Sequence, residues 1–573
     1  MGKKLTDEQR ARALAVLSRM QAHRFFWKAS GYIDRDLDRP VVAVANSMQD
    51  AGVGHMHLRE LARHVKEAVY AAGGTPIEFN VIAPCAGYTR NSSIDDVNLL
   101  YDLPQRDVIA DSIEIQMMNY GADGLVCIGT CDKIIPGMWL GAARMNLPTI
   151  FLPGGPAPPG KWRGEETVFP TNVMVRGLNM VLAGDMTEDE FFDELHRMES
   201  CWICGPGACP ELTTANTTMI ATEAMGLCLP GASTAPGNEI ERVHLARETG
   251  HAIMELVKSG VSFDSIVGTD AVNDAARAVM AVSGSTNGIL HLLSLAVAMG
   301  LPVTLDDFQN ISDDTPYIAA LRPGGPYSMI DFHRAGGVLG LLKTLGKRVS
   351  ADRPTAAHKS MAELIDKAAV TDDRVIRPAE DPAHPTGGIV VMKGNLAPEG
   401  ALVRHTVVGP EGGEFTGPAV CFDTQLDAIM GILGGAVKSG DVMVIRYQGP
   451  RGGPGFSENF KVVLLLDALG LNDVAVITDS RFSGATEGAL YAGYISPEAY
   501  VGGPLAAVHN GDDVTISVKK RRIDVDLTDE EIAKRLKDHA PPPARITEGV
   551  LVSWRMTATQ FHEGAMLKRK LDT

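Results

Sequence analysis

Residues 124–153 decide the fold, and they read GLVCIGTCDKIIPGMWLGAARMNLPTIFLP. The apolar run at 125–128 predicts a buried strand that ends at Gly129. Pro136 opens a predicted helix that continues to Ala143, and residues 148–152 predict the next strand. The stretch therefore predicts a strand–helix–strand unit, in which ligands bind just beyond the carboxyl end of the first strand.

Three chemically different side chains follow the first of these strands: Cys131, Asp132 and Lys133. Thiolates suit iron–sulfur clusters or zinc, whereas carboxylates suit magnesium or calcium. One loop that carries both favours a site with two kinds of metal centre. The competing interpretation is a turn with a buried Cys and a solvated Asp–Lys pair, and the tripeptide by itself favours that interpretation.

Composition indicates an acidic globular protein of 573 residues, 45% of them apolar, with a net charge of −17. Such a chain is a poor general binder of nucleic acid or anionic membranes, so an anionic substrate needs local cations or a metal. The start of the chain lacks the apolar core of a signal peptide, and no apolar run approaches the length of a bilayer span. We therefore expect a cytoplasmic protein whose eight cysteines are reduced thiols, core residues or metal ligands.

The predicted fold class is α/β, with a large N-terminal α/β/α domain and a C-terminal β-rich, barrel-like domain. Residues 41–46 predict a buried strand, a helix should follow to about residue 72, and residues 79–83 predict another strand. The polar, Pro-containing stretch at 345–385 indicates a domain boundary. We expect a metal-binding domain at 1–385 and, at 386–573, a domain of short strands and Gly turns that closes the active site.

Further candidate residues lie in loops. Cys209 ends a Gly- and Pro-rich loop, a type of backbone that can wrap a cluster. Ser483 follows a β-branched strand, where a nearby cation would make it a nucleophile or base. Glu458 follows the glycine-rich stretch at 449–455, which lacks the Gly-Lys-Ser/Thr ending of a nucleotide-binding loop. Each feature alone is better explained as a buried thiol, a Ser bonded to backbone or a solvated Glu.

Taken together, these stretches resemble the dihydroxy-acid dehydratase / 6-phosphogluconate dehydratase family, which includes sugar-acid dehydratases. The resemblance covers nearly the whole chain, and many matches occur in the same order. The matching motifs are IADSIE (109–114), CDKIIPG (131–137), GAC (207–209), TANT (214–217), GSTN (284–287), LHL (290–292), KGNLAPEG (393–400), 447–455 and 478–484.

The resemblance implies a hydro-lyase that depends on Mg²⁺ and an iron–sulfur cluster of the 2Fe–2S type. Asp132, Lys133 as a carbamate, and Glu458 match the Mg²⁺ ligands. Ser483 matches the proposed base, so Ser483 and Lys133 are the expected catalytic residues. The implied reaction converts a sugar acid (aldonate) or related 2,3-dihydroxy acid to the 2-keto-3-deoxy acid, and a branched-chain 2,3-dihydroxy acid is the alternative substrate. A homodimer or homotetramer is expected.

Two cluster ligands are matched by Cys131 and Cys209, but the sequence departs from the family pattern at the first cluster Cys. There the motif reads VGHMHL, so that Gly54 stands where the family has a thiol. The family also has an Asp-Gly Mg²⁺ ligand, and here that loop reads PCAG at 84–87.

Three interpretations of these departures stay open. In the first, Cys85 or His55 replaces the missing cluster ligand, and Asp95 or Asp96 replaces the Mg²⁺ ligand. In the second, the cluster is absent and the chain catalyses an altered Mg²⁺-dependent reaction. In the third, the chain is a non-catalytic paralogue with a binding or regulatory role.

Overall fold

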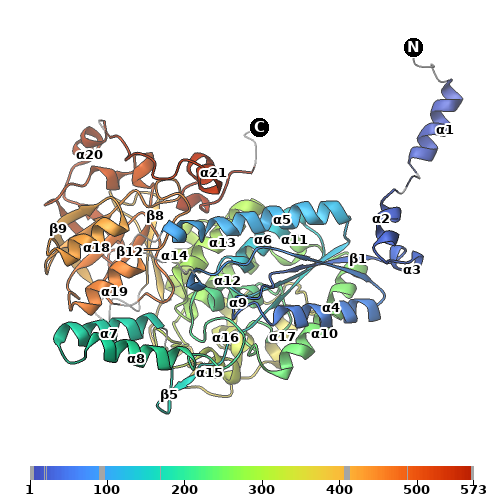
Figure 1. Ribbon diagram of the computed structural model, residues 1–573, viewed down its shortest axis with the longest axis horizontal. Helices are drawn as coiled ribbons and strands as arrows, with labels where there is room; N and C mark the ends of the chain where they lie inside the picture. The colour runs from blue at the N-terminus through green and yellow to red at the C-terminus, as the bar shows by residue number, and fades with distance from the viewer. Residues whose placement is uncertain are drawn as a thin grey trace.

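The computed structural model describes residues 6–18, 20, 22–88, 97–167, 170–404, 413–486, 488–537 and 539–569. Two main sheets organise the chain, one in the N-terminal half and one in the C-terminal part, with a layer of helices between them (Figure 1). The predicted fold class, a large N-terminal α/β domain followed by a barrel-like β-rich domain, is confirmed. The predicted boundary at residue 385 stays a prediction.

The first sheet has four parallel strands in the order β2-β1-β3-β4. Every residue of β3 and β4 is buried, as expected for a parallel sheet with helices on its faces. Helices α5 and α6 pack against each other, and α4 packs against α10 on the sheet (Figure 1). The bounds are β1 Val41–Asn46, β2 Thr75–Asn80, β3 Gly124–Gly129, β4 Thr149–Pro153, α4 Leu58–Ala71, α5 Pro104–Tyr120, α6 Ile134–Met145 and α10 Ile240–Ser259.

The predicted strand–helix–strand unit is confirmed as β3, α6 and β4, with Leu125 paired to Thr149 in parallel register. The strand expected at 79–83 is wrong in its position, because β2 already ends at Asn80. Its ladder starts directly after the turn at Gly73 and Gly74, where the Thr75 amide donates to the Pro40 carbonyl at 2.8 Å. The polar appearance of residues 75–78 hid a strand that is set by its pairing with β1.

Three buried helices form the centre of the molecule: α9 (Thr214–Ala224) and α12 (Thr269–Ala281), which are rich in small residues, and α13 (Thr286–Met299). The last two are separated by a short break between Ala281 and Thr286. A Cβ at Gly288 would lie 2.7 Å from the Thr217 side chain, so glycine is needed for α9 and α13 to approach closely. This packing places the 284–287 motif against the second sheet, where Asn287 accepts a hydrogen bond from Tyr494.

The second sheet has eight strands in the order β14-β13-β9-β10-β11-β12-β8-β7. Strands β9 to β12 run parallel, and the outer pairs are antiparallel. A bridge between Lys393 and Arg522 joins the two edges, so the sheet is a nearly closed barrel. The bounds are β7 Ile389–Met392, β8 Gly400–Arg404, β9 Glu414–Phe422, β10 Val442–Ile445, β11 Ala475–Thr478, β12 Tyr491–Ser496, β13 Asp513–Ser517, β14 Arg522–Val525, α18 Gln425–Leu433 and α19 Phe460–Ala468.

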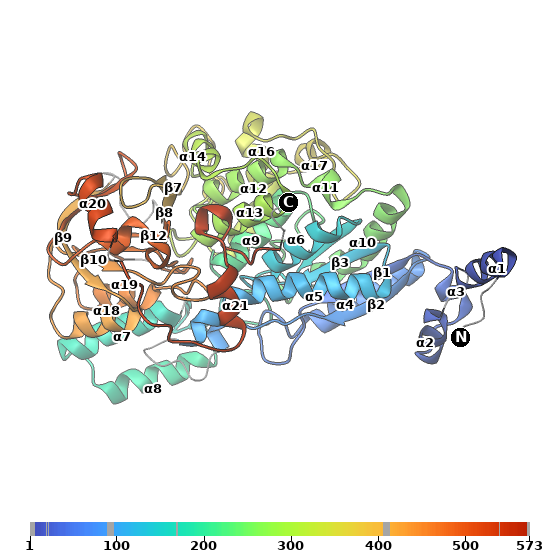
Figure 2. The same ribbon diagram turned by 90° about the horizontal axis from the view of Figure 1, so that it is seen from above.

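The remaining elements surround these layers. Helix α7 packs under α19, whereas α1 to α3 extend away from the body (Figures 1 and 2). No described helix combines the length and apolarity that a membrane crossing requires. The bounds are α1 Asp7–Leu17, α2 His23–Ala29, α3 Asp34–Leu37, β5 Lys161–Trp162, β6 Glu165–Glu166, α7 Pro170–Ala183, α8 Glu188–Glu199, α11 Phe263–Ile266, α14 Leu305–Asp314, α15 Met329–Ala335, α16 Gly337–Leu345, α17 Met361–Lys367, α20 Asp529–Leu536 and α21 Val550–Thr557.

The hydrogen bonds that close the barrel predict that Asn395 stabilises the fold. Its Oδ1 accepts from the Val525 amide at 2.8 Å, and its Nδ2 donates to the Val525 carbonyl at 2.9 Å. We expect Asn395→Ala to cost about 1–3 kcal/mol, because backbone groups lose their partners. Urea unfolding measures this loss. Thr416→Ala, which removes an exposed hydroxyl pair on the same sheet, should change stability by less than about 0.5 kcal/mol. An equal free energy of unfolding in the two variants would show that Asn395 does not stabilise the closed barrel.

Candidate active site

A buried ammonium lies among three carboxylates at the carboxyl end of β3. Lys133, whose side chain is 1% exposed, places Nζ 2.6 Å from Asp102 Oδ2, 3.2 Å from Asp132 Oδ2 and 3.5 Å from Glu458 Oε1. Glu458 comes from the C-terminal part of the chain, in the loop between β10 and α19. The predicted residues Asp132, Lys133 and Glu458 are therefore brought together, although they come from the two halves of the chain.

Local structure explains these positions. Cys131, Asp132 and Lys133 form the turn that leads from β3 into α6, where the Ile134 amide donates to the Cys131 carbonyl at 3.0 Å. Glu458 forms a short bridge with Arg481, so the stretches 457–459 and 480–482 run side by side. The loop after β10 and the loop after β11 thus reach the same point.

The guanidinium of Arg481 joins the two halves of the site. It is fully buried and donates to Asp102 Oδ2 at 3.1 Å, to Glu458 Oε1 at 2.8 Å and to Asn287 Oδ1 at 2.7 Å. Asn287 in turn donates to Glu458 Oε1 at 2.9 Å and accepts from Tyr494. A planar donor fork suits this bridging of two carboxylates.

Charge is unevenly shared within this cluster. Burial opposes ionisation of Asp102, but Lys133 and Arg481 outweigh it and lower the pKa of this carboxyl. For Asp132, desolvation and then the nearby carboxylates Asp102 and Glu458 outweigh Lys133 and raise the pKa. Three carboxylates against two cations make Asp132 the least compensated member, and it is also the most accessible, with 38% of its side chain exposed. The cluster therefore favours an additional cation near Asp132.

Ser483 lies two residues beyond Arg481 in a tight turn and is partly exposed. The Ala485 amide points to its Oγ at 3.4 Å, and the carbonyl of the preceding Phe482 accepts from Asn287 at 3.3 Å. A Cβ at Gly484 would lie 2.8 Å from the Ser285 side chain, so this turn packs directly on the 284–287 motif. Asn287 therefore connects the Ser483 turn to Glu458.

Three thiols gather beside the carboxylates. Cys85 and Cys131 share a hydrogen bond, which lowers the pKa of Cys85 and raises that of Cys131. Burial, followed by the charge of Cys85, raises the pKa of Cys209. A Cβ built on Gly54 would lie 3.1 Å from Cys131 Sγ, so a side chain at this position would face the same thiols. The predicted Cys131, Cys209 and Cys85 are thus neighbours, and Gly54 borders them.

His55, the other candidate for the missing cluster ligand, is fully buried, and neither ring nitrogen has a hydrogen-bond partner among the described residues. Burial and the nearby His57 lower the pKa of His55 to about 4, so the ring is neutral at pH 7. Asp95 and Asp96 lie outside the described residues. Within the described part of the chain, no three His, Cys, Asp or Glu side chains are arranged as ligands of one ion, and the cation between the carboxylates is the Lys133 ammonium.

Three residues of this site were missed by sequence reasoning. Asp102 lies in the sequence YDLP just before α5, where no spacing relates it to Lys133. Arg481 and Asn287 belong to recognised motifs, but their contacts to carboxylates from another part of the chain are visible only in the fold. The sequence did contain a signal that could have identified Arg481 as part of the site. It lies between a buried strand and a tight turn, and a buried guanidinium there needs a carboxylate partner.

Comparison with known proteins agrees with this geometry. Two family models match in succession: dihydroxy-acid/6-phosphogluconate dehydratase N-terminal over residues 39–364 and the C-terminal counterpart over 374–565. The chain belongs to the dihydroxy-acid/6-phosphogluconate dehydratase family. The predicted resemblance and the predicted enzyme class, a hydro-lyase, are confirmed.

Individual relatives cover almost the full length of this dehydratase. A dihydroxy-acid dehydratase of Pyrococcus furiosus is 42% identical over 95% of this chain and 97% of its own. Those of Ignicoccus hospitalis and Methanococcus aeolicus are 41% and 38% identical, over 95% of this chain and 97% and 98% of their own.

The glycine-rich loop of the dehydratase already holds an internal anion. The amides of Arg451 and Gly452 donate to the Glu498 carboxylate, the latter at 2.8 Å. Gly455 has φ +104°, and a Cβ there would lie 1.8 Å from the Leu100 carbonyl oxygen. The loop therefore binds a carboxylate of its own chain and packs against the segment that leads into Asp102.

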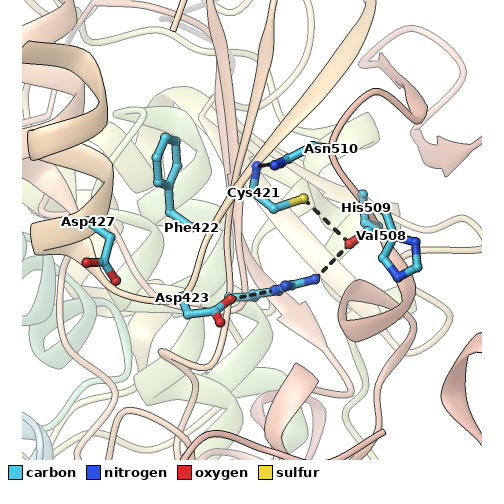
Figure 3. Close-up of a pocket in the computed structure, with 8 residues that line it drawn as sticks. Cys421, Phe422, Asp423, Asp427, Val508, His509 and Asn510 are labelled. Atoms are coloured by element: carbon cyan, nitrogen blue, oxygen red, sulfur yellow. Dashed lines mark hydrogen bonds and ion pairs between the residues drawn. The ribbon is translucent and has the colours of Figure 1, made fainter. Parts of the chain in front are cut away.

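A surface pocket of about 490 Å³ lies on the second sheet, away from these residues (Figure 3). It is lined by the end of β9 and by the loop at 508–510. Arg446 is paired there with Asp423 at 2.7 Å and with the Val508 carbonyl at 2.7 Å, and Cys421 Sγ donates to the same carbonyl. None of its lining residues belongs to the carboxylate or thiol clusters.

The bridging position of Arg481 predicts a large effect of its removal. Arg481→Met leaves the buried Asp102 and Glu458 with Lys133 as their one remaining shared cation, and we expect a loss of about 3–5 kcal/mol. Arg522→Met, which removes a surface pair with Asp524, should cost about 1 kcal/mol or less. Denaturant unfolding of both variants measures the difference. A similar, small loss in both would show that the Arg481 bridge does not stabilise the fold.

Proposed function

We propose that this dehydratase removes water from a 2,3-dihydroxy acid and forms the 2-keto-3-deoxy acid. The observation that carries the proposal is the meeting of Lys133, Asp132 and Glu458 next to the three thiols, at the carboxyl end of β3. The relatives are named dihydroxy-acid dehydratases, which supports a dihydroxy acid as the substrate. An aldonate and a branched-chain dihydroxy acid are the two substrate candidates.

The donor set fits the two groups that the family resemblance implies. Oxygen ligands suit Mg²⁺ and thiolates suit an iron–sulfur cluster. Asp132, Glu458 and carbamylated Lys133 would hold Mg²⁺. Carbamylation turns the Lys133 cation into an anion, so that the surrounding carboxylates then need a different cation. When bound, Mg²⁺ and a 2Fe–2S cluster would supply Lewis-acid chemistry at the substrate's carboxylate, its 2-hydroxyl and its departing 3-hydroxyl.

For the cluster we propose Cys85, Cys131 and Cys209 as ligands, with Cys85 in place of the family thiol that Gly54 lacks. The hydrogen bond between Cys85 and Cys131, an expected cluster ligand, supports this choice over His55. The lowered pKa of Cys85 also favours its thiolate, which is the ligand form of cysteine.

The protein's own residues would act as follows. Ser483, as its alkoxide, accepts the C2 proton at Oγ while the electrons of the C2–H bond form the C2=C3 double bond. The 3-hydroxyl leaves with the electrons of its C–O bond and takes the proton from Ser483 Oγ to become water, and the enol rearranges to the 2-keto acid. Arg481 and Asn287 hold Glu458 and the Ser483 turn in fixed positions. The expected cytoplasmic location and homodimeric or homotetrameric assembly rest on the resemblance alone and stay predictions.

Substrate turnover tests the reaction. Anaerobically purified protein with Mg²⁺ should form 2-keto acid from at least one member of a panel of aldonates and branched-chain 2,3-dihydroxy acids. Ser483→Ala should lower kcat by about 100-fold or more, because the proton acceptor is lost. Ser439→Ala, at the surface, should keep the wild-type kcat. Failure of the wild type on the whole panel would favour a non-catalytic paralogue, and an unchanged kcat in Ser483→Ala would exclude this base.

Iron content tests the thiol assignment. Cys85→Ser should lose most of the iron and acid-labile sulfide, whereas Cys421→Ser on the second sheet should keep both. Introducing Gly54→Cys into the Cys85→Ser protein should restore part of the iron, because the Gly54 Cβ position lies 3.1 Å from Cys131 Sγ. Iron in Cys85→Ser at the wild-type level would refute Cys85. A colourless wild type that still dehydrates its substrate would support the interpretation without a cluster.

A further inference from the structure

We infer that Asp102 is a metal-binding carboxylate of this dehydratase and supplies the acidic ligand that the loop at 84–87 lacks. The inference rests on the proposed Mg²⁺ function of the site. It adds a residue that neither the family motifs nor their spacing indicated.

The position of Asp102 is set by the backbone around it. It lies between the short 3₁₀ turn at 97–101 and α5, which begins at Pro104. The Asp102 amide donates to the Leu99 carbonyl at 3.2 Å. Gly455 of the glycine-rich loop packs against Leu100 from the other half of the chain. Asp102 is therefore held by both halves of the molecule at the place where Glu458 arrives.

Its carboxylate faces the same point as the predicted ligands. Asp102 Oδ2 lies 2.6 Å from Lys133 Nζ, the shortest of the three carboxylate contacts of this ammonium. The side chain is 8% exposed. Asp102, Asp132 and Glu458 thus converge on a single cationic centre, which in this structure is Lys133 Nζ.

An ion pair with Lys133 does not by itself explain how the buried charge of Asp102 is compensated. If Lys133 carries a carbamate, as the resemblance implies, it is an anion, and among the described residues Asp102 then keeps Arg481 alone as a cationic partner. Arg481 already binds Glu458 and Asn287 through its other terminal nitrogen. A buried carboxylate beside a carbamate and two further carboxylates requires another cation, and a divalent ion supplies it.

A second, independent feature points to an oxygen-binding ligand at this place. Gln105 is 5% exposed, and its Nε2 donates to Asp102 Oδ1 at 3.4 Å. Its Oε1 is buried and has no hydrogen-bond partner among the described residues. A buried carbonyl oxygen without a donor is rare, and a hydrated Mg²⁺ beside Asp102 would supply the missing donor through a bound water.

Metal binding, measured without turnover, tests the inference. The protein is stripped with chelator and titrated with Mn²⁺ as a probe, followed by electron paramagnetic resonance, with Mg²⁺ as competitor. The wild type should bind one Mn²⁺ tightly per chain. Asp102→Asn should weaken this binding by about 10- to 100-fold, and Asp102→Glu should lose less, because it keeps the carboxylate.

The matched control is Asp274→Asn, which removes a buried carboxylate paired with Arg353 at 3.2 Å, away from the site. It should lower the unfolding temperature but leave the Mn²⁺ affinity within about twofold, because additivity holds for distant sites. If Asp102→Asn fails to fold, Asp102→Ala is titrated instead.

The outcomes separate this inference from the proposed function. Wild-type Mn²⁺ affinity in Asp102→Asn, in a protein that binds Mn²⁺ and turns over substrate, overturns the role of Asp102 alone. A wild type that neither binds Mn²⁺ nor dehydrates any acid of the panel overturns the proposed function and the inference with it. Weakened binding in Asp102→Asn with an unchanged Asp274→Asn establishes Asp102 as part of the metal centre.

Discussion

The structure depends on the compensation of buried charge where its two halves meet. Lys133 and Arg481 are almost completely buried, and each contacts one carboxylate from the first half of the chain, Asp102, and one from the second, Glu458. Each half contributes one cation–carboxylate pair, Lys133–Asp102 and Arg481–Glu458. Contact between the halves adds Lys133–Glu458 and Arg481–Asp102, so that the four charges share one buried network. Docking of the two sheets therefore completes the active site.

Most of the surrounding architecture maintains this meeting point. Strand β3 of the parallel sheet ends at the turn that carries Lys133. The close packing of α9 and α13, at Thr217 and Gly288, brings Asn287 to the second sheet. The backbone amides of the glycine-rich loop are hydrogen-bonded to the Glu498 carboxylate. The loop packs closely against Leu100, in the segment before Asp102. Rigid support of this kind fits a reaction in which a base must stand close to a weakly acidic C–H bond.

Much of the fold could be predicted from the sequence, because apolar runs and Gly or Pro punctuation are local signals. They located β3, α6 and β4 and the short strands of the barrel. The strand near Phe79 was misplaced because pairing with β1, a non-local contact, decides where it starts. Asp102 was missed for the same reason. It belongs to the site because its carboxylate lies close to Lys133, and no pattern in the sequence relates these two positions.

The two proposed replacements have a common origin in the connection between β2 and α5. Cys85 lies near its start and Asp102 at its end, and their side chains meet the thiol cluster and the carboxylate cluster respectively. A soft ligand is absent at Gly54 and a hard ligand is absent at 84–87. In the proposed assignment, this one connection supplies a substitute for each. The site then keeps its donor types, thiols and carboxylates, at the same place in the fold, although two of the donors come from different positions in the sequence.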